Sequence, residues 1–212
     1  MTVNLVLTAL FGACLFVLYR VYRARVIAHR AHLIDTYRFP PSIAEKVIKA
    51  YPHLGPADAE LVMMGLREYF QVTNVAGKRM VAMPSQVVDV AWHEFILFTR
   101  QYQHFCSKAL GRFLHHPPAE AMVTPTSAQT GIKTAWRASC HREGIKPDSP
   151  TRLPLLFKLD SQLNIPDGFR YSINCLAEGR NDYCAGHIGC SSGCAGGCSG
   201  DSSGCGGGCG GD

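Results

Sequence analysis

The middle of the chain carries the clearest hydrophobic pattern. From Gln86 onward, apolar residues recur at steps of three and four, which predicts a helix with a broad buried face. These apolar positions are Val88, Trp92, Phe95, Ile96, Phe98, Tyr102, Phe105 and Cys106. Ser85 can cap the first turn of this helix, Gly111 is a plausible end, and Pro117 prevents any continuation. We therefore expect one continuous helix from about residue 86 to residue 110.

Shorter patterned segments on either side predict a mainly helical fold. Helices are expected over residues 42–50, 58–70, 131–143 and 155–163. Ser42 and Glu45 have the spacing of a capping box at the start of the first of them. Residues 73–81 suit either a short hairpin or a loop, 122–130 predict a surface linker, and 169–173 predict one short strand.

The N-terminal segment predicts a membrane anchor. Residues 3–19 are apolar apart from small or weakly polar positions, and the run through Tyr22 approaches the length that spans a bilayer. Four arginines follow or interrupt its end, namely Arg20, Arg23, Arg25 and Arg30. A positive flank of this kind is retained on the cytoplasmic side. We expect a single-pass protein held in the cytoplasmic membrane through residues 3–22, with its N-terminus outside and its domain and tail in the cytoplasm.

The last 29 residues differ from the rest of the chain. They alternate Gly and Ser with six of the ten cysteines, which are Cys184, Cys190, Cys194, Cys198, Cys205 and Cys209. With almost no apolar residues, this tail is expected to be disordered. Thiolates favour zinc, Cu(I) or iron–sulfur clusters, so the tail is a candidate site for a soft metal. Two alternatives stay open, because the tail also suits enzymatic cysteine modification or a simple flexible extension.

The central helix holds most of the side chains that could do chemistry. Asp89 and His93 are four residues apart and lie on one face, while His115 and His116 follow the expected end of the helix. A carboxylate beside a histidine can fix its tautomer and prepare it as a metal ligand or a general base. Imidazole suits zinc and copper among other transition metals. A purely structural Asp–His pair is the alternative.

The same stretch resembles a known family. Its pattern is Val88-Asp89-x-x-Trp92-His93, followed by Tyr102, Phe105-Cys106, Gly111 and His115-His116-Pro117. In this pattern the chain resembles the glycine-rich domain-containing protein family over roughly residues 41–118, and its tail resembles that of uncharacterised bacterial members. The resemblance carries no established activity. Many of those relatives have a second histidine where this chain has Phe95, which would leave one ligand fewer here.

Composition narrows the function classes. The chain has 212 residues, 47% apolar and 17% charged, with a net charge of +5. That excess lies mostly in the arginines near the N-terminus, so no nucleic-acid surface is indicated. Nucleotide-binding and hydrolase-elbow motifs are absent. We expect three parts: an anchor with a basic flank (1–30), a helical domain (31–183) and the tail (184–212).

The pattern favours a binding protein over an enzyme. In this interpretation the protein handles a transition metal such as zinc or copper through the tail cysteines and the cluster of Asp89, His93, His115 and His116. The rival interpretation is an enzyme in which His93 acts as base or metal ligand and Asp89 orients it. A third is a scaffold whose tail binds an unidentified protein partner.

Overall fold

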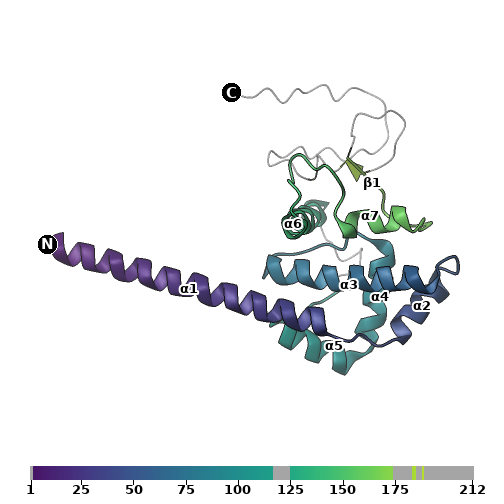
Figure 1. The fold of residues 1–212 in the computed structure, drawn as a ribbon, viewed down its shortest axis with the longest axis horizontal. Helices are drawn as coiled ribbons and strands as arrows, with labels where there is room; N and C mark the ends of the chain where they lie inside the picture. The colour runs from purple at the N-terminus through teal and green to yellow at the C-terminus, as the bar shows by residue number, and fades with distance from the viewer. Residues whose placement is uncertain (1, 117–124, 174–182, 185–187, 189–212) are drawn as a thin grey trace, which may run out of the picture.

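The computed structural model describes residues 2–116, 125–173, 183–184 and 188, and these confirm a mainly helical protein (Figure 1). The elements are α1 (Thr2–Thr36), α2 (Ser42–Ala50), α3 (Pro56–Ala76), α4 (Gln86–Leu97), α5 (Thr99–Phe105), the π-helix η1 (Cys106–Leu110), α6 (Pro125–Glu143), α7 (Leu155–Gln162), β1 (Tyr171–Ser172) and β2 (Tyr183–Cys184). The two short strands pair in parallel, with Tyr171 opposite Tyr183.

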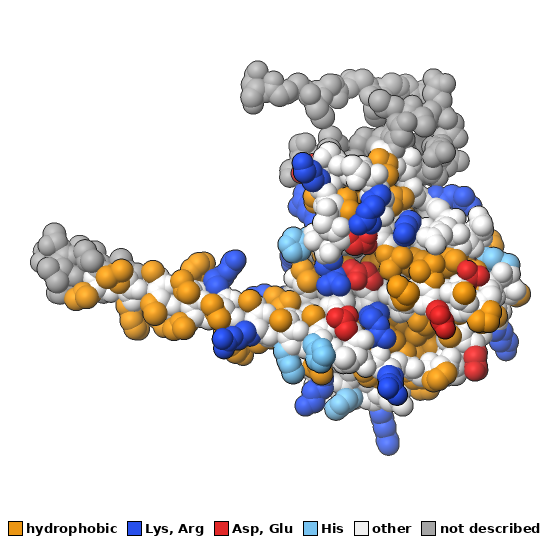
Figure 2. All heavy atoms as spheres, viewed as in Figure 1, with side chains coloured by type: hydrophobic (Ala, Val, Ile, Leu, Met, Phe, Trp, Pro, Cys, Tyr) orange, Lys and Arg blue, Asp and Glu red, His pale blue; other side chains and the backbone are white. Residues whose placement is uncertain are grey.

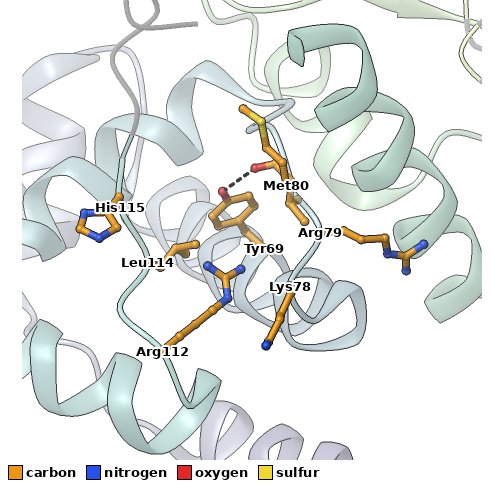
Figure 3. A pocket seen from close by; sticks show the side chains of 8 residues that line it. Tyr69, Lys78, Arg79, Met80, Arg112, Leu114 and His115 are labelled. Carbon is orange, nitrogen blue, oxygen red and sulfur yellow. Dashed lines mark hydrogen bonds between the residues drawn. The ribbon is translucent and has the colours of Figure 1, made fainter. Parts of the chain in front are cut away.

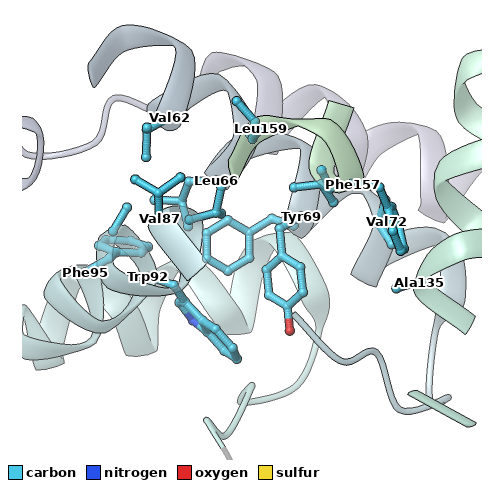
Figure 4. Close-up of a cluster of buried hydrophobic side chains, with 14 of the residues drawn as sticks. Val62, Leu66, Tyr69, Val72, Val87, Trp92, Phe95, Ala135, Phe157 and Leu159 are labelled. Carbon is cyan, nitrogen blue, oxygen red and sulfur yellow. The ribbon is translucent and has the colours of Figure 1, made fainter. Parts of the chain in front are cut away.

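Helix α3 is the centre of the fold. It packs against α1, α2, α4, α6 and α7, and its buried side chains meet those of α4 and α7 in a single core (Figure 4). Gly65 lets α7 approach closely, because a Cβ atom there would lie 2.5 Å from Leu159 Cδ1 and 2.8 Å from Val88 Cγ2. The core therefore depends on a small residue where three helices meet.

Helix α1 belongs to the domain only along its C-terminal half. There the Gln71 amide donates to the Ala31 carbonyl and the Asp35 carboxylate, and the Asn74 amide donates to the Ile27 carbonyl. Its N-terminal half projects away from the domain (Figure 1) and displays apolar side chains (Figure 2). Within the described part of the chain, no helix combines the length and the apolar character needed to cross a membrane. The expected membrane-spanning helix over residues 3–22 is therefore not supported.

The expected single central helix is broken. Helix α4 ends at Leu97, and Phe98 takes non-helical angles (φ −80°, ψ 58°) before α5 begins. The change of direction places Phe105 against Phe70, with ring centroids 4.7 Å apart, and Tyr102 against Phe95 at 5.3 Å. Burial of these rings favours the break over a straight helix. The two ends were predicted correctly, since Ser85 accepts from the Val88 amide and Gly111 has φ +68°.

Several smaller predictions need correction. Ser42 lies inside α2 and no side chain caps that helix, so its capping box is wrong. Helix α3 runs to Ala76 and ends at Gly77, which excludes the hairpin over residues 73–81. Helix α6 begins at Pro125, inside the expected linker. Apart from Cys184 and Ile188, the tail lies outside the described residues, so its predicted disorder and metal binding stay predictions.

Candidate metal site

Three of the predicted site residues lie together. Asp89 and His93 are one turn apart on α4, and His116 follows η1 in the chain. The Asp89 Oδ1 and His116 Nε2 atoms are 2.9 Å apart, and the rings of His93 and His116 meet edge to face at 4.7 Å. One ligand atom from each of the three residues falls within 4.8 Å of the other two. Asp89 and His116 are partly buried, whereas His93 is exposed, so the cluster opens to solvent on one side.

A chain of hydrogen bonds holds His116 in place. The Trp92 indole donates to the Tyr102 hydroxyl at 3.1 Å, and that hydroxyl donates to the Leu114 carbonyl two residues before His116. The Trp92 ring also packs on the His116 ring at 4.6 Å. Burial raises the pKa of Tyr102 above its ordinary value, so the hydroxyl stays protonated and keeps donating. Trp92 and Tyr102 therefore position the His116 side chain, which comes from another segment of the chain.

His115 is directed elsewhere. Its ring packs against Phe113 at 4.7 Å, and it lines a separate cavity instead of joining the cluster. Cys184, the one tail cysteine among the described residues, lies in β2. The other five, Cys190, Cys194, Cys198, Cys205 and Cys209, are outside the described residues. The structure therefore brings together Asp89, His93 and His116 of the predicted ligand set.

Asp89 pairs with a different histidine from the one predicted. The carboxylate was expected to orient His93, but its hydrogen bond is to His116. Two imidazoles and a carboxylate are a donor set that zinc accepts, with bonds of roughly 2.0–2.2 Å. A tetrahedral ion would hold such donors roughly 3.4 Å apart. Binding would thus open the Asp89–His116 contact by about half an ångström and leave one coordination position for solvent.

Two features escaped the sequence analysis. Asp160 is 3% exposed, and its carboxylate accepts from the Ser85 hydroxyl and from the amides of Gln86, Val87 and Phe169. Its role is structural, because it joins the start of α4 to α7. The second feature is a cavity lined by basic residues near the end of α3. The adjacent Lys78-Arg79 pair was a signal for it, but Arg112 comes from a distant segment.

Comparisons with known proteins correct the family assignment. A family model described as UCP032817-like matches residues 29–191, which include the whole Asp89, His93 and His116 cluster. Searches of curated proteins and of solved structures each found no significant match. The resemblance to the glycine-rich domain-containing protein family is therefore wrong. Its short pattern around Trp92-His93 was too local, whereas the family model is matched along most of the helical domain.

Proposed function

We propose that this chain, which belongs to the UCP032817-like family, binds a divalent transition-metal ion through Asp89, His93 and His116. The observation that carries the proposal is the convergence of their three ligand atoms within 4.8 Å. Two nitrogen donors and one oxygen donor suit zinc, and Cu(II) is the alternative for the same donor set. The exposed side at His93 leaves room for a fourth ligand from solvent.

The contacts around His116 resemble those that orient a metal-binding histidine. Metal-binding histidines are usually held by neighbouring hydrogen bonds that fix the ring orientation. Here His116 is held by the Trp92 ring and, through the Leu114 carbonyl, by Tyr102. The contact between Asp89 and His116 also has a structural role, because it holds the segment after η1 against α4. A metal measurement separates these two roles.

The test is metal binding by the full chain with all tail cysteines changed to serine, so that thiolates cannot contribute. Co²⁺ titration reports coordination geometry through its visible absorption, and elemental mass spectrometry gives the zinc content. His93→Ala and His116→Ala should each weaken binding by about tenfold or more, because each removes one of three ligands. His115→Ala is the matched control, since it removes the neighbouring imidazole, which packs on Phe113.

A contrary result has a clear form. The metal proposal fails if the serine-tailed protein takes up no stoichiometric zinc or cobalt. It also fails if His115→Ala lowers the affinity as much as His116→Ala does. Loss of thermal stability in His116→Ala without any metal binding by the parent protein would leave the Asp89–His116 pair as a structural contact.

We also propose that the N-terminal half of α1 contacts the apolar layer of a lipid membrane. Five consecutive side chains, Leu15, Phe16, Val17, Leu18 and Tyr19, are each between 51% and 62% exposed. Five consecutive residues cover more than one helical turn, so apolar groups face outward on every side. A groove on a protein would bury one face, whereas lipid contacts all of them. This proposal does not require the helix to cross the bilayer.

Vesicle association tests the lipid proposal. The full chain should cofloat with phosphatidylcholine vesicles, and Leu15→Asn with Leu18→Asn should abolish most of that association. Met64→Asn with Leu97→Asn is the matched control, because those side chains are 58% and 62% exposed on the domain. Equal flotation of both double variants would refute the proposal. The arginines also predict that the domain lies on the cytoplasmic side. Protease protection in cells measures on which side of the membrane it lies.

A further inference from the structure

A cavity that His115 lines, one residue before His116 in the chain, has a basic lining. Its volume is about 240 Å³, and its walls come from the end of α3, the loop after it and the segment after η1. The lining residues are Tyr69, Lys78, Arg79, Met80, Val81, Arg112, Leu114 and His115. Figure 3 shows the Arg112 side chain extending toward Tyr69, whereas the Lys78 amine extends away from that ring and Arg79 extends toward α6. Arg112 and Lys78 therefore both line this cavity, one from the segment after η1 and the other from the loop after α3.

These cations have no acidic partner among the residues the structure describes. The cavity lining includes no carboxylate, and the ion pairs found in the described ranges involve neither Lys78 nor Arg112. One guanidinium nitrogen of Arg112, Nη2, donates to the Gly77 carbonyl at 3.1 Å. A guanidinium has five N–H donors, so this bond fixes its position and leaves others for a ligand.

We propose that this cavity binds a small phosphate-bearing anion. Arg112 presents planar paired donors that match phosphate oxygens, and Lys78 adds a mobile positive charge at the same opening. The volume is below the roughly 300–1,000 Å³ of pockets for drug-sized ligands. It therefore suits a phosphate or a small phosphomonoester better than a nucleotide. The Tyr69 hydroxyl donates to the Val81 carbonyl at 3.2 Å and helps to hold one wall of the cavity.

Helix capping alone does not explain the arrangement. The carbonyls at the end of α3 do attract cations, and Arg79 Nε donates to the Ala76 carbonyl. Lys78, however, makes no hydrogen bond or ion pair within the described part of the chain. Its charge adds to the opening without capping the helix, so an anion would gain a contact that the fold itself does not use.

The phosphate could come from solution or from a lipid headgroup. An added Cβ at Gly111 would fall on the Arg30 guanidinium, and one at Gly77 would lie 3.9 Å from the Arg23 guanidinium. Both loops that form the cavity therefore lie against the basic part of α1. If α1 contacts lipid, the cavity opens close to the headgroups. Both sources share the same phosphate chemistry, and the experiment separates them.

The experiment follows the melting temperature of the full chain in neutral detergent with inorganic phosphate. Ionic strength is held constant because exposed charges are screened by salt, and a chelator keeps the metal cluster empty. Phosphate should raise the melting temperature in a saturable way. Lys78→Gln should weaken the apparent affinity by about three- to tenfold, and Arg112→Gln by about tenfold or more. Lys49→Gln and Arg100→Gln remove the same charges from exposed sites elsewhere.

A parallel arm uses the protein in phosphatidylcholine vesicles with and without phosphatidate. Stabilisation by phosphatidate that Lys78→Gln removes, with no response to free phosphate, would assign the site to a lipid headgroup. The proposal is overturned if neither phosphate source stabilises the protein, or if the Lys49→Gln control loses as much affinity as Lys78→Gln. Phosphate should give the same response with the chelator present and in a His93→Ala background, so failure of the metal proposal would leave this test intact.

Discussion

The Asp160 carboxylate accepts a hydrogen bond of 2.7 Å from the Ser85 hydroxyl, although the two residues are 75 positions apart. Both side chains are buried, since Ser85 is 0% exposed and Asp160 is 3% exposed. Ser85 is also the cap of α4, since its hydroxyl accepts from the Val88 amide. One carboxylate on α7 therefore fixes the start of the helix that carries Asp89 and His93.

Replacing Asp160 should destabilise the whole domain. Asp160→Ala removes the acceptor of the buried Ser85 hydroxyl and Val87 amide and of the partly buried Gln86 amide. Each donor left unpaired in the core is costly. We expect a loss of about 3 kcal/mol or more in the free energy of unfolding, measured by urea denaturation. Asp160→Asn keeps one oxygen acceptor and should cost less. The exposed Glu60→Ala is the control, and a similar loss in both would contradict this role.

Tyr102 should affect the proposed metal site through His116. Tyr102→Phe leaves the Trp92 indole and the Leu114 carbonyl without their shared partner, which should cost about 1–2 kcal/mol of stability. The segment that carries His116 should then be less well ordered, and Co²⁺ affinity should fall by about three- to tenfold. Tyr37→Phe removes a hydroxyl from the same aromatic core and serves as control. Unchanged affinity in Tyr102→Phe would assign this tyrosine to stability alone.

The attachment of α1 should depend on two amides. Gln71→Ala together with Asn74→Ala removes the hydrogen bonds to Ala31, Asp35 and Ile27. Because α1 would then open locally more often, trypsin should cleave within its basic segment about tenfold faster. Mass spectrometry of the fragments locates the cleavage. Met64→Ala, at an exposed position on the same helix, should leave the cleavage rate unchanged. If the double variant is cleaved no faster than the unaltered chain, the two amides do not attach α1.

Cys140 should be chemically protected. Burial, with a smaller effect of Glu143, raises the pKa of its thiol from 9.0 to about 11. At neutral pH iodoacetamide should modify the exposed Cys14 rapidly and Cys140 only on unfolding. The neutral thiol contributes stability that is fully present below pH 9.0. That contribution falls as pH rises toward about 11, because the unfolded chain loses its proton first. Cys140→Ala should reduce this loss of stability at alkaline pH. If the free energy of unfolding depends on pH identically in the variant and the unaltered chain, the prediction is wrong.

Local sequence patterns predicted most of the helices. The three- and four-residue apolar period marked α4 and α7. Ser85 and Gly111 marked the two ends of the central stretch, which are the start of α4 and the end of η1. The same reasoning missed the break at Phe98, because that residue continues the apolar period. Packing of Phe105 and Tyr102 against other helices decides the break. Periodicity reports which side chains are apolar and does not report the direction in which a helix is free to continue.

The sequence by itself determined that the chain is mainly helical and that Asp89 and His93 share one helix face, since both follow from a period of 3.6 residues. Only the tertiary structure decided which neighbouring histidine joins them. Gly111 and the bond from Tyr102 to the Leu114 carbonyl direct His116 to Asp89, while His115 packs on Phe113. The tertiary structure also places Lys78 and Arg112 in the lining of one cavity. Such contacts depend on loops and long-range packing, which no local pattern encodes.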